Sequence, residues 1–155
     1  MTSIKSKYPL VSIIILTYNC EQTIKKCLSS VFNVDYPRDR YEVIIIDSGS
    51  NDTTLEIVKE FPIDKIVVKK GISRGHARNI GVQEARGEIV AMVDSDHEQS
   101  SKDWLTTIVG EFDDPRVALV RVPDRIPVPS KGEAIGLVKK IIYFSSIRPE
   151  RLKED

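Results

Sequence analysis

The stretch Ile89-Val90-Ala91-Met92-Val93 is followed directly by Asp94-Ser95-Asp96. Five apolar residues in a row predict a strand that is buried on both faces, and the aspartates mark the point where it reaches the surface. In extended backbone, side chains two residues apart project to the same side, so Asp94 and Asp96 would present their carboxylates together. Such a pair suits Mg²⁺ or Mn²⁺ shared with phosphate oxygens. The alternative is a simple turn that Asp96 caps, with Asp94 solvated, because tripeptides of this kind are common.

Apolar runs recur along the chain and predict five strands, at residues 11–16, 43–46, 66–68, 89–93 and 117–122. The first four runs are nearly continuous, which is typical of strands covered on both faces. Amphipathic stretches between them predict helices at residues 24–32, 53–61, 77–85 and 104–112. Asn19 and Gln22 have the spacing of a capping box before the first helix. This alternation predicts an α/β fold with a mostly parallel sheet.

The 155 residues fit a single domain, with a short N-terminal tail at residues 1–9 and a βα core at residues 10–122. Three prolines within residues 123–130 predict a linker. Apolar residues spaced from Ala134 to Phe144 predict a last amphipathic helix within residues 131–155, with Lys131, Lys139 and Lys140 on or near its polar side. Such a helix packs on its own domain or, alternatively, lies on a membrane surface or a partner.

Lysines plus arginines and aspartates plus glutamates both number 23, so the formal net charge is zero. No general attraction to nucleic acid follows from this balance. The apolar runs are too short to span a bilayer, and the first ten residues lack the apolar segment of a signal peptide. Cys20 and Cys27, which fall around the first predicted helix, are typical of reduced thiols in a cytoplasmic protein.

Polar residues follow three of the predicted strands. They occur in Thr17-Tyr18-Asn19, in the segment from Asp47 to Asp52, and in Asp94-Ser95-Asp96. Ligands of open α/β sheets bind outside the carboxyl ends of the strands. Each segment alone also has an ordinary explanation, such as a core-edge aromatic, a helix cap or a turn. Together at one sheet edge, they indicate a binding site.

The order and spacing of these segments resemble the inverting glycosyltransferases of family 2, which have the GT-A nucleotide-diphospho-sugar transferase fold. The resemblance covers residues 11 to about 105. It implies a Rossmann-like three-layer sandwich, truncated in this chain. It rests on Val11–Asn19, Ile46–Thr53, Ala77–Gly81, Ala85–Val90, Asp94–Asp96 and Trp104-Leu105.

The resemblance implies roles for individual residues at the base of the donor. Thr17 and Tyr18 would line the base pocket, and Asp47 would read the edge of a uracil-type base. A carboxylate suits that role because it accepts hydrogen bonds from base N–H groups. Arg78 would lie near the base and the diphosphate, with Arg74 as its neighbour.

The resemblance also implies roles at the diphosphate. Asp94 would approach the ribose and the metal, Ser95 would lie beside the donor, and Asp96 would bind the Mg²⁺ or Mn²⁺ that bridges the diphosphate. The metal would neutralise charge that develops on the leaving nucleoside diphosphate.

The sequence departs from the family pattern at three places. Ser48 stands where many relatives have a second aspartate. His97 follows the paired aspartates directly, as a loop residue or alternatively as a third ligand or an acceptor contact. The general base that family members carry in a later Glu-Asp pair has only Glu154-Asp155 as a counterpart. The catalytic base is therefore unassigned, with Asp155 as a weak candidate, and the acceptor half looks absent.

We therefore expect a metal-dependent glycosyltransferase that uses a UDP-sugar and inverts the anomeric centre. Its acceptor would be a sugar, lipid or protein, at the cytoplasmic face of a membrane or free in the cytoplasm, and a longer native chain could carry a C-terminal membrane segment. One alternative is a nucleotide-sugar-binding module or fragment without turnover. The other is a sugar-phosphate nucleotidyltransferase, although the segment Leu16–Glu21 lacks the Gly, Arg and Lys typical of that class.

Overall fold

The computed structural model describes residues 7–123 and 140–145 of the chain. These residues form one six-stranded sheet, four α-helices and two short 3₁₀ helices. In chain order the elements are β1 (Val11–Thr17), α1 (Ile24–Phe32), η1 (Arg38–Arg40), β2 (Tyr41–Asp47), α2 (Thr54–Val58), β3 (Lys65–Val68), α3 (Arg74–Glu84), β4 (Ile89–Asp94), α4 (Trp104–Gly110), η2 (Glu111–Asp113), β5 (Leu119–Pro123) and β6 (Lys140–Ser145).

The sheet has the strand order β3-β2-β1-β4-β6-β5, and every pairing in it is parallel. The central strand β1 lies between β2 and β4, with Leu16 opposite both Ile46 and Asp94. Thr17, the last residue of β1, is opposite Asp47, the last residue of β2. The carboxyl ends of these three strands therefore meet at one edge of the sheet.

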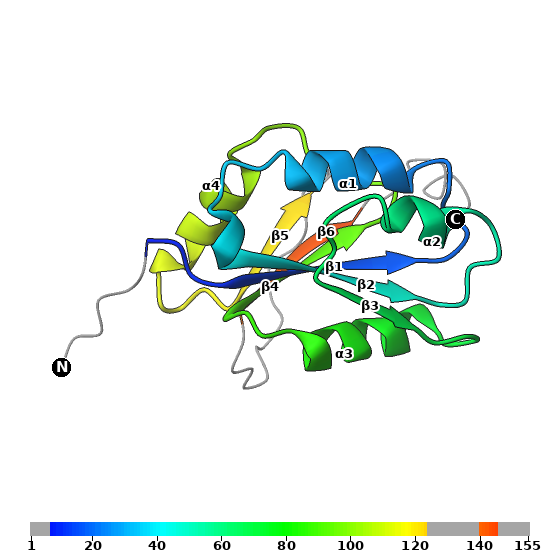
Figure 1. The fold of residues 1–155 in the computed structure, drawn as a ribbon. Coiled ribbons are helices and arrows are strands. Elements are labelled where there is room, and N and C mark those ends of the chain that lie inside the picture. The colour runs from blue at the N-terminus through cyan, green and yellow to red at the C-terminus, as the bar shows by residue number, and fades with distance from the viewer. Residues whose placement is uncertain (1–6, 124–139, 146–155) are drawn as a thin grey trace, which may run out of the picture.

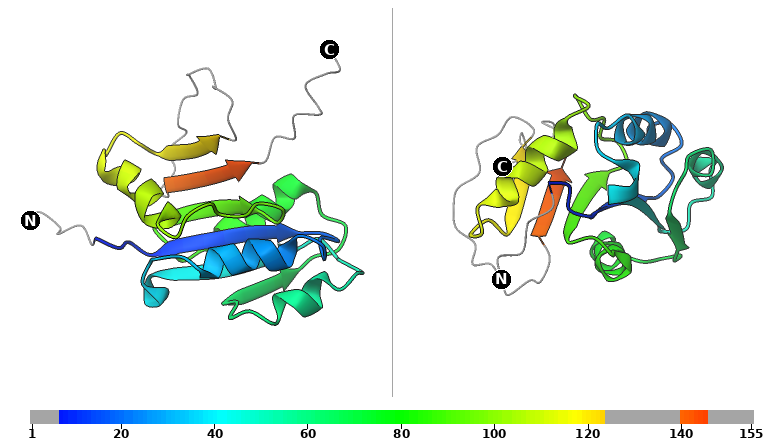
Figure 2. Two further views of the ribbon diagram at one scale, coloured as in Figure 1. Left: turned by 90° about the horizontal axis from the view of Figure 1, so that it is seen from above. Right: turned by 60° about the vertical axis from the view of Figure 1, so that its left-hand side comes forward.

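Helices cover the sheet on both faces, as Figures 1 and 2 show: α3 lies on one face, and α1, α2 and α4 lie on the other. Successive side chains of β1 alternate between these layers. Ile13 and Ile15 pack in the larger core with α1 and α4, whereas Ile14 packs in the smaller core with Ala77 of α3. The predicted three-layer α/β architecture is confirmed.

A buried carboxylate fixes the connection from α3 to β4. Glu42 of β2 is 4% exposed and accepts hydrogen bonds from the hydroxyl of Ser12 (2.5 Å), from the backbone N–H of Arg86 (2.8 Å) and from Nε of Arg86 (2.7 Å). The Ser12 hydroxyl in turn accepts from the N–H of Gly87 at 2.8 Å. A Cβ on Gly87 would lie 2.6 Å from the Ser12 backbone nitrogen, so only glycine allows this close approach.

The prediction of a C-terminal helix is wrong for residues 140–145, the part of it that the structure describes. Lys140–Ser145 forms β6, which lies between β4 and β5. The run Ile141-Ile142-Tyr143-Phe144 is β-branched and aromatic, and short apolar runs of this kind fit a strand as well as a helix. The predicted linker begins at Pro123, which is the last residue of β5, and the rest of it lies outside the described residues, as do residues 131–139 and 146–155.

Two smaller expectations are also wrong. Asn19 and Gln22 form no capping box, because Thr23 is the N-cap of α1 and Asn19 has a left-handed φ of 45°. The strand β3 is not covered on both faces, since it is an edge strand in which Ile66 and Val68 are 36% and 45% exposed. Within residues 7–123 and 140–145, no helix is both long and apolar enough to cross a membrane.

Candidate nucleotide-binding site

Three adjoining cavities lie where β1, β2 and β4 end. The acidic cavity, of about 320 Å³, is lined by Leu16, Asn19, Cys20, Glu21, Gln22, Thr23, Asp52, Arg74, Asp94, Ser95 and Asp96. The tyrosine cavity, of about 530 Å³, is lined by Tyr18, Ser48, Gly49, Ser50, Asn51, Lys70, Gly71 and Ile72. The connecting cavity, of about 260 Å³, is lined by Leu16, Thr17, Tyr18, Ser48, Ile72, Arg74, Ala77 and Ser95.

The three cavities form a continuous groove because they share residues. The connecting cavity shares Tyr18, Ser48 and Ile72 with the tyrosine cavity. It shares Leu16, Arg74 and Ser95 with the acidic cavity. The sheet register thus places an exposed aromatic ring at one end of the groove and carboxylates at the other.

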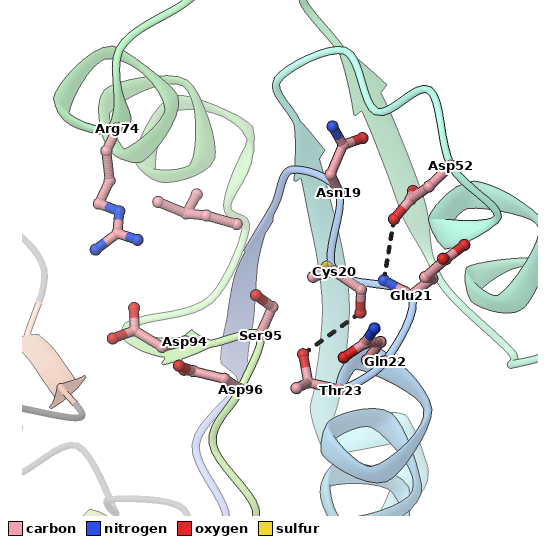
Figure 3. A pocket seen from close by; sticks show the side chains of 11 residues that line it. Asn19, Cys20, Glu21, Gln22, Thr23, Asp52, Arg74, Asp94, Ser95 and Asp96 are labelled. Carbon is pink, nitrogen blue, oxygen red and sulfur yellow. Dashed lines mark hydrogen bonds between the residues drawn. The ribbon is translucent and has the colours of Figure 1, made fainter. Parts of the chain in front are cut away.

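The paired aspartates lie together on one wall of the acidic cavity (Figure 3). Asp94 ends β4, and the N–H of His97 donates to the Asp94 carbonyl at 2.9 Å, so the chain turns tightly after the strand. Asp96 therefore lies in a turn rather than in extended backbone, and the turn still keeps the two carboxylates on the same wall. Arg74, at the start of α3, extends its guanidinium toward Asp94 from above.

A buried thiol supports the same turn from below. Cys27 of α1 donates from Sγ to the Asp94 carbonyl at 3.6 Å. Burial raises the pKa of Cys27 to about 12, so this thiol stays protonated and able to donate. Burial also raises the pKa of Cys20, which lines the acidic cavity. At neutral pH both thiols are therefore protonated, and the charged groups of this cavity that could meet a cation are carboxylates rather than thiolates.

Reciprocal hydrogen bonds join the loop after β1 to the loop after β2. The N–H of Asn19 donates to Oγ of Ser50 (2.9 Å), and the N–H of Asn51 donates back to Oδ1 of Asn19 (2.9 Å). The carboxylate of Glu21 accepts from the N–H and the hydroxyl of Thr53, at 3.0 and 2.7 Å. These bonds make the two loops one unit, so the groove wall that they form is preorganised.

Two further hydrogen bonds connect the loop after β1 to the segment that leads into α2. The N–H of Glu21 donates to Oδ2 of Asp52 at 3.2 Å, as Figure 3 shows, and the N–H of Cys20 donates to the hydroxyl of Thr54 at 2.8 Å. Asp52 also accepts from the N–H of Thr54 at 3.0 Å. Glu21 and Asp52 are therefore engaged in holding the loops, even though they line the acidic cavity.

Asp47 lies deeper than the other predicted site residues. Its side chain is fully buried and lines none of the three cavities. Oδ1 accepts from the N–H groups of Gly49 (2.9 Å) and Ser50 (2.8 Å), while Oδ2 accepts from the hydroxyls of Thr17 (2.8 Å) and Ser50 (2.6 Å). The carboxylate thus organises the loop after β2 from inside and does not face the groove, where the neighbouring Ser48 lies instead.

The other predicted site residues divide between the groove and its surroundings. Thr17 and Tyr18 line the connecting cavity, and the Tyr18 ring is 62% exposed. Arg74 lines two of the cavities, whereas Arg78, which was expected near the base and the diphosphate, lines none of these three. The reason is helical geometry, because Arg74 is the first residue of α3 and points past the strand ends, while Arg78 lies one turn further along. Asp155 lies outside the described residues.

Sequence reasoning missed part of the groove wall, namely Lys70, Gly71 and Ile72, and assigned no role to Ser48. Lys70–Ile72 follow the edge strand β3, which showed no polar motif at its end. The signal that could have found them is Gly71, which has a φ of 72° and lets the chain turn toward α3.

The donor set fits a divalent cation shared with phosphate. Among the residues that the structure describes, no group of three or more His, Cys, Asp and Glu side chains could hold a metal by itself. Mg²⁺ at nucleotide sites is typically held by one or two carboxylates together with waters and substrate phosphates. Asp94 and Asp96 can supply those carboxylates from the wall of the acidic cavity.

A family model described as glycosyl transferase family 2 matches residues 12–151. The chain therefore belongs to glycosyl transferase family 2. It is 35% identical over 113 residues to glycosyltransferase AglE of Haloferax volcanii, which covers 68% of this chain and 37% of the relative.

Two solved structures share the fold. The S. aureus TarS 1–349 structure in complex with UDP-GlcNAc has a TM-score of 0.66 at 28% identity, covering 78% of this chain and 37% of that one. The mannosyltransferase PcManGT from Pyrobaculum calidifontis, in complex with GDP-Man and Mn²⁺, has a TM-score of 0.66 at 34% identity, covering 74% and 35%. The predicted GT-A fold is confirmed, and the chain spans little more than a third of the length of these relatives.

Proposed function

We propose that this chain forms the donor-binding part of a metal-dependent glycosyltransferase that uses a UDP-sugar and inverts the anomeric centre. The observation that carries the proposal is the continuous groove with Tyr18 at one end and Asp94 and Asp96 at the other. Nucleotide-sugar complexes of the structural relatives support this class of donor.

The nucleoside would bind in the tyrosine and connecting cavities. The exposed ring of Tyr18 offers an apolar face on which a base can stack. Ser48 and Ile72, which both of these cavities share, would flank the base and ribose. Because hydrogen bonds fix the loop that carries Tyr18 before any ligand arrives, little ordering entropy would be lost on binding.

The diphosphate would bind in the acidic cavity. Arg74 would donate to the phosphate oxygens through its planar guanidinium, a geometry that suits bidentate recognition. Asp94 and Asp96 would hold Mg²⁺ or Mn²⁺, and Ser95 lies between them at the junction with the connecting cavity. When bound, the metal supplies positive charge that stabilises the leaving nucleoside diphosphate.

A second candidate function, nucleotide-sugar binding without transfer by this chain alone, has its own support. Inverting transfer requires a general base at the acceptor hydroxyl. Glu21 and Asp52 are committed to the joined loops, and Asp94 and Asp96 are assigned to the metal. In the described part of the chain the acidic cavity therefore has no further carboxylate for that role.

The test is calorimetric titration of the chain with UDP in the presence of Mn²⁺ or of a chelator. We expect Mn²⁺ to raise the affinity at least about tenfold, equivalent to about 1.4 kcal/mol, because the paired carboxylates repel a diphosphate until a cation bridges them. Asp96→Ala should remove the metal effect.

Glu111→Ala, which removes an exposed carboxylate from η2, is the matched control and should keep the metal effect. Equal affinity in Mn²⁺ and in chelator would contradict the proposed metal site. A UDP-sugar consumption assay on the same protein then separates the two candidate functions, since only the first gives turnover with an acceptor.

A further inference from the structure

The loop after β4, residues 95–103, carries the proposed metal ligand Asp96 and is hydrogen-bonded to α1. We infer that Ser30 of α1 is a positioning residue for the proposed metal site, because its hydroxyl holds this loop so that the carboxylates of Asp94 and Asp96 stay together on the cavity wall. This inference rests on the proposed function, since the metal site belongs to it.

Side chains of α1 hold the metal-binding segment at two points. Cys27 donates from Sγ to the carbonyl of Asp94 at 3.6 Å, and the hydroxyl of Ser30 accepts from the N–H of Gln99 at 3.0 Å. Cys27 and Ser30 lie one turn apart in α1, so their side chains project from the same face of the helix. The two residues that they hold, Asp94 and Gln99, stand on either side of Asp96 in the sequence.

The Ser30 hydroxyl is oriented for this role. It donates to the carbonyl of Cys27 at 2.8 Å, one turn earlier in the helix. A serine hydroxyl has one donor and two acceptor positions, so once its hydrogen is used within the helix it faces the loop as an acceptor. Gln99 is held through its backbone rather than its side chain, since its side-chain Nε2 is buried without a hydrogen-bond partner in the described part of the chain.

The far end of the loop is held independently of Ser30. The N–H of Asp35, beyond the end of α1, donates to the carbonyl of Lys102 at 2.7 Å, and the hydroxyl of Thr106 in α4 donates to the carbonyl of Asp35 at 3.2 Å. Ser30 holds the stretch between Asp94 and this far end, so loss of its hydroxyl would give that stretch more conformational freedom.

The position of the loop affects metal binding because like charges tend to separate. Asp94 and Asp96 share one wall of the acidic cavity, and two carboxylates so placed repel one another until a cation lies between them. A loop with more freedom would reduce this repulsion by carrying Asp96 away from Asp94, which is fixed at the end of β4. The apparent affinity of a site falls with the population of its binding-competent conformation, so metal binding would weaken.

The experiment is calorimetric titration of the chain with UDP, in Mn²⁺ and in chelator, for the wild type, Ser30→Ala, Ser30→Thr and Ser29→Ala. We expect Ser30→Ala to reduce the gain in affinity due to Mn²⁺ by about three- to tenfold, while the affinity in chelator stays within about twofold. Ser30→Thr retains a hydroxyl that can make both bonds and should keep the gain within about twofold. Ser29→Ala is the matched control, because Ser29 is the neighbouring exposed serine of the same helix, and it should leave both affinities unchanged.

Hydrogen exchange measured by mass spectrometry gives a second readout, which a general loss of stability would not change selectively. In Ser30→Ala without ligand, the amides of residues 96–101 should exchange at least about threefold faster than in the wild type, while those of β1 and β2 keep their rates. Addition of UDP and Mn²⁺ should restore most of the protection, because the metal binds the loop in its held position.

An unchanged Mn²⁺ gain in Ser30→Ala would overturn the inference while the proposed function stands. An equal loss of affinity in Mn²⁺ and in chelator would do the same, since Ser30 would then support the groove as a whole. A Ser30→Thr variant as weak as Ser30→Ala would assign the loss to packing rather than to the hydroxyl and would also overturn the inference. A folded wild type that shows no Mn²⁺ gain would overturn the proposed metal site, and the inference with it.

Discussion

Replacement of Asp47 tests whether this carboxylate builds the groove or touches the ligand. In Asp47→Ala the four donors that now meet the carboxylate lose their acceptor. Thr17 is 2% exposed, so its hydroxyl would stay without a partner, which costs about 1–3 kcal/mol. Gly49 and Ser50 are half-buried, so their N–H groups would be hydrated again. We expect a total loss of about 2–4 kcal/mol in the free energy of unfolding.

Asp47→Asn separates the two roles. Its amide oxygen can replace Oδ1, and its NH₂ group can donate to a hydroxyl that rotates, so we expect a loss of only about 1 kcal/mol and UDP affinity within about threefold of wild type. Urea unfolding, followed by the fluorescence of Trp104, gives the stabilities. Asp103→Ala, at an exposed position whose side chain makes no cap hydrogen bond, is the control. An Asn variant of wild-type stability that loses UDP affinity tenfold would refute this reasoning and make Asp47 a base contact.

Gly87→Ala should lower the free energy of unfolding by about 1–3 kcal/mol, because its Cβ would overlap the backbone of β1. Gly110→Ala is the control, since a Cβ there meets nothing within 4 Å. Similar urea midpoints for the Gly87→Ala and Gly110→Ala variants would contradict the close approach of Gly87 to β1. Burial raises the pKa of Glu42, but hydrogen bonds from Ser12 and Arg86 and the charge of Arg86 outweigh it and hold the pKa below its usual range. The stability that this carboxylate adds is therefore present at neutral pH and is lost as the pH falls through the lowered pKa. In Glu42→Gln the melting temperature should fall less steeply with decreasing pH than in the wild type. An unchanged dependence of the melting temperature on acid pH would contradict the hydrogen-bond network. Cys27, with a pKa of about 12, should not react with iodoacetamide at pH 8 until urea unfolds the chain. Mass spectrometry of the treated protein measures this, and alkylation of Cys27 in the native protein would contradict its burial.

Much of the fold could be predicted because its signals are local. Continuous apolar runs predicted β1, β2 and β4 within one or two residues of their observed bounds, and helical periodicity predicted α1 over Ile24–Phe32. The rule that parallel strands end at one edge then brought the site segments together. β6 could not be predicted in this way, because its apolar run is compatible with two periods and only its neighbours β4 and β5 decide between them.

The candidate site was predictable by residue type but not by orientation. Asp47 is a strand-end aspartate, as expected, yet the partners that turn its carboxylate inward come from Thr17 on another strand and Ser50 in the loop. No local pattern encodes such a contact. Lys70 escaped notice for a related reason, since its place in the groove wall depends on the pairing of β3 with β2.

The insertion of β6 beside β4 sets the order in which the sheet can be completed during synthesis. The chain finishes β4 at Asp94, continues through α4 and β5, and supplies the neighbouring strand only at Lys140–Ser145. At about 5–20 residues per second, residues 95–139 between them take several seconds to translate. Throughout that interval β4, which ends at Asp94, has a free hydrogen-bonding edge, which is the kind of edge that pairs with other chains. The strand that carries Asp94 into the candidate site is therefore completed on its second side only after most of the sheet has been made.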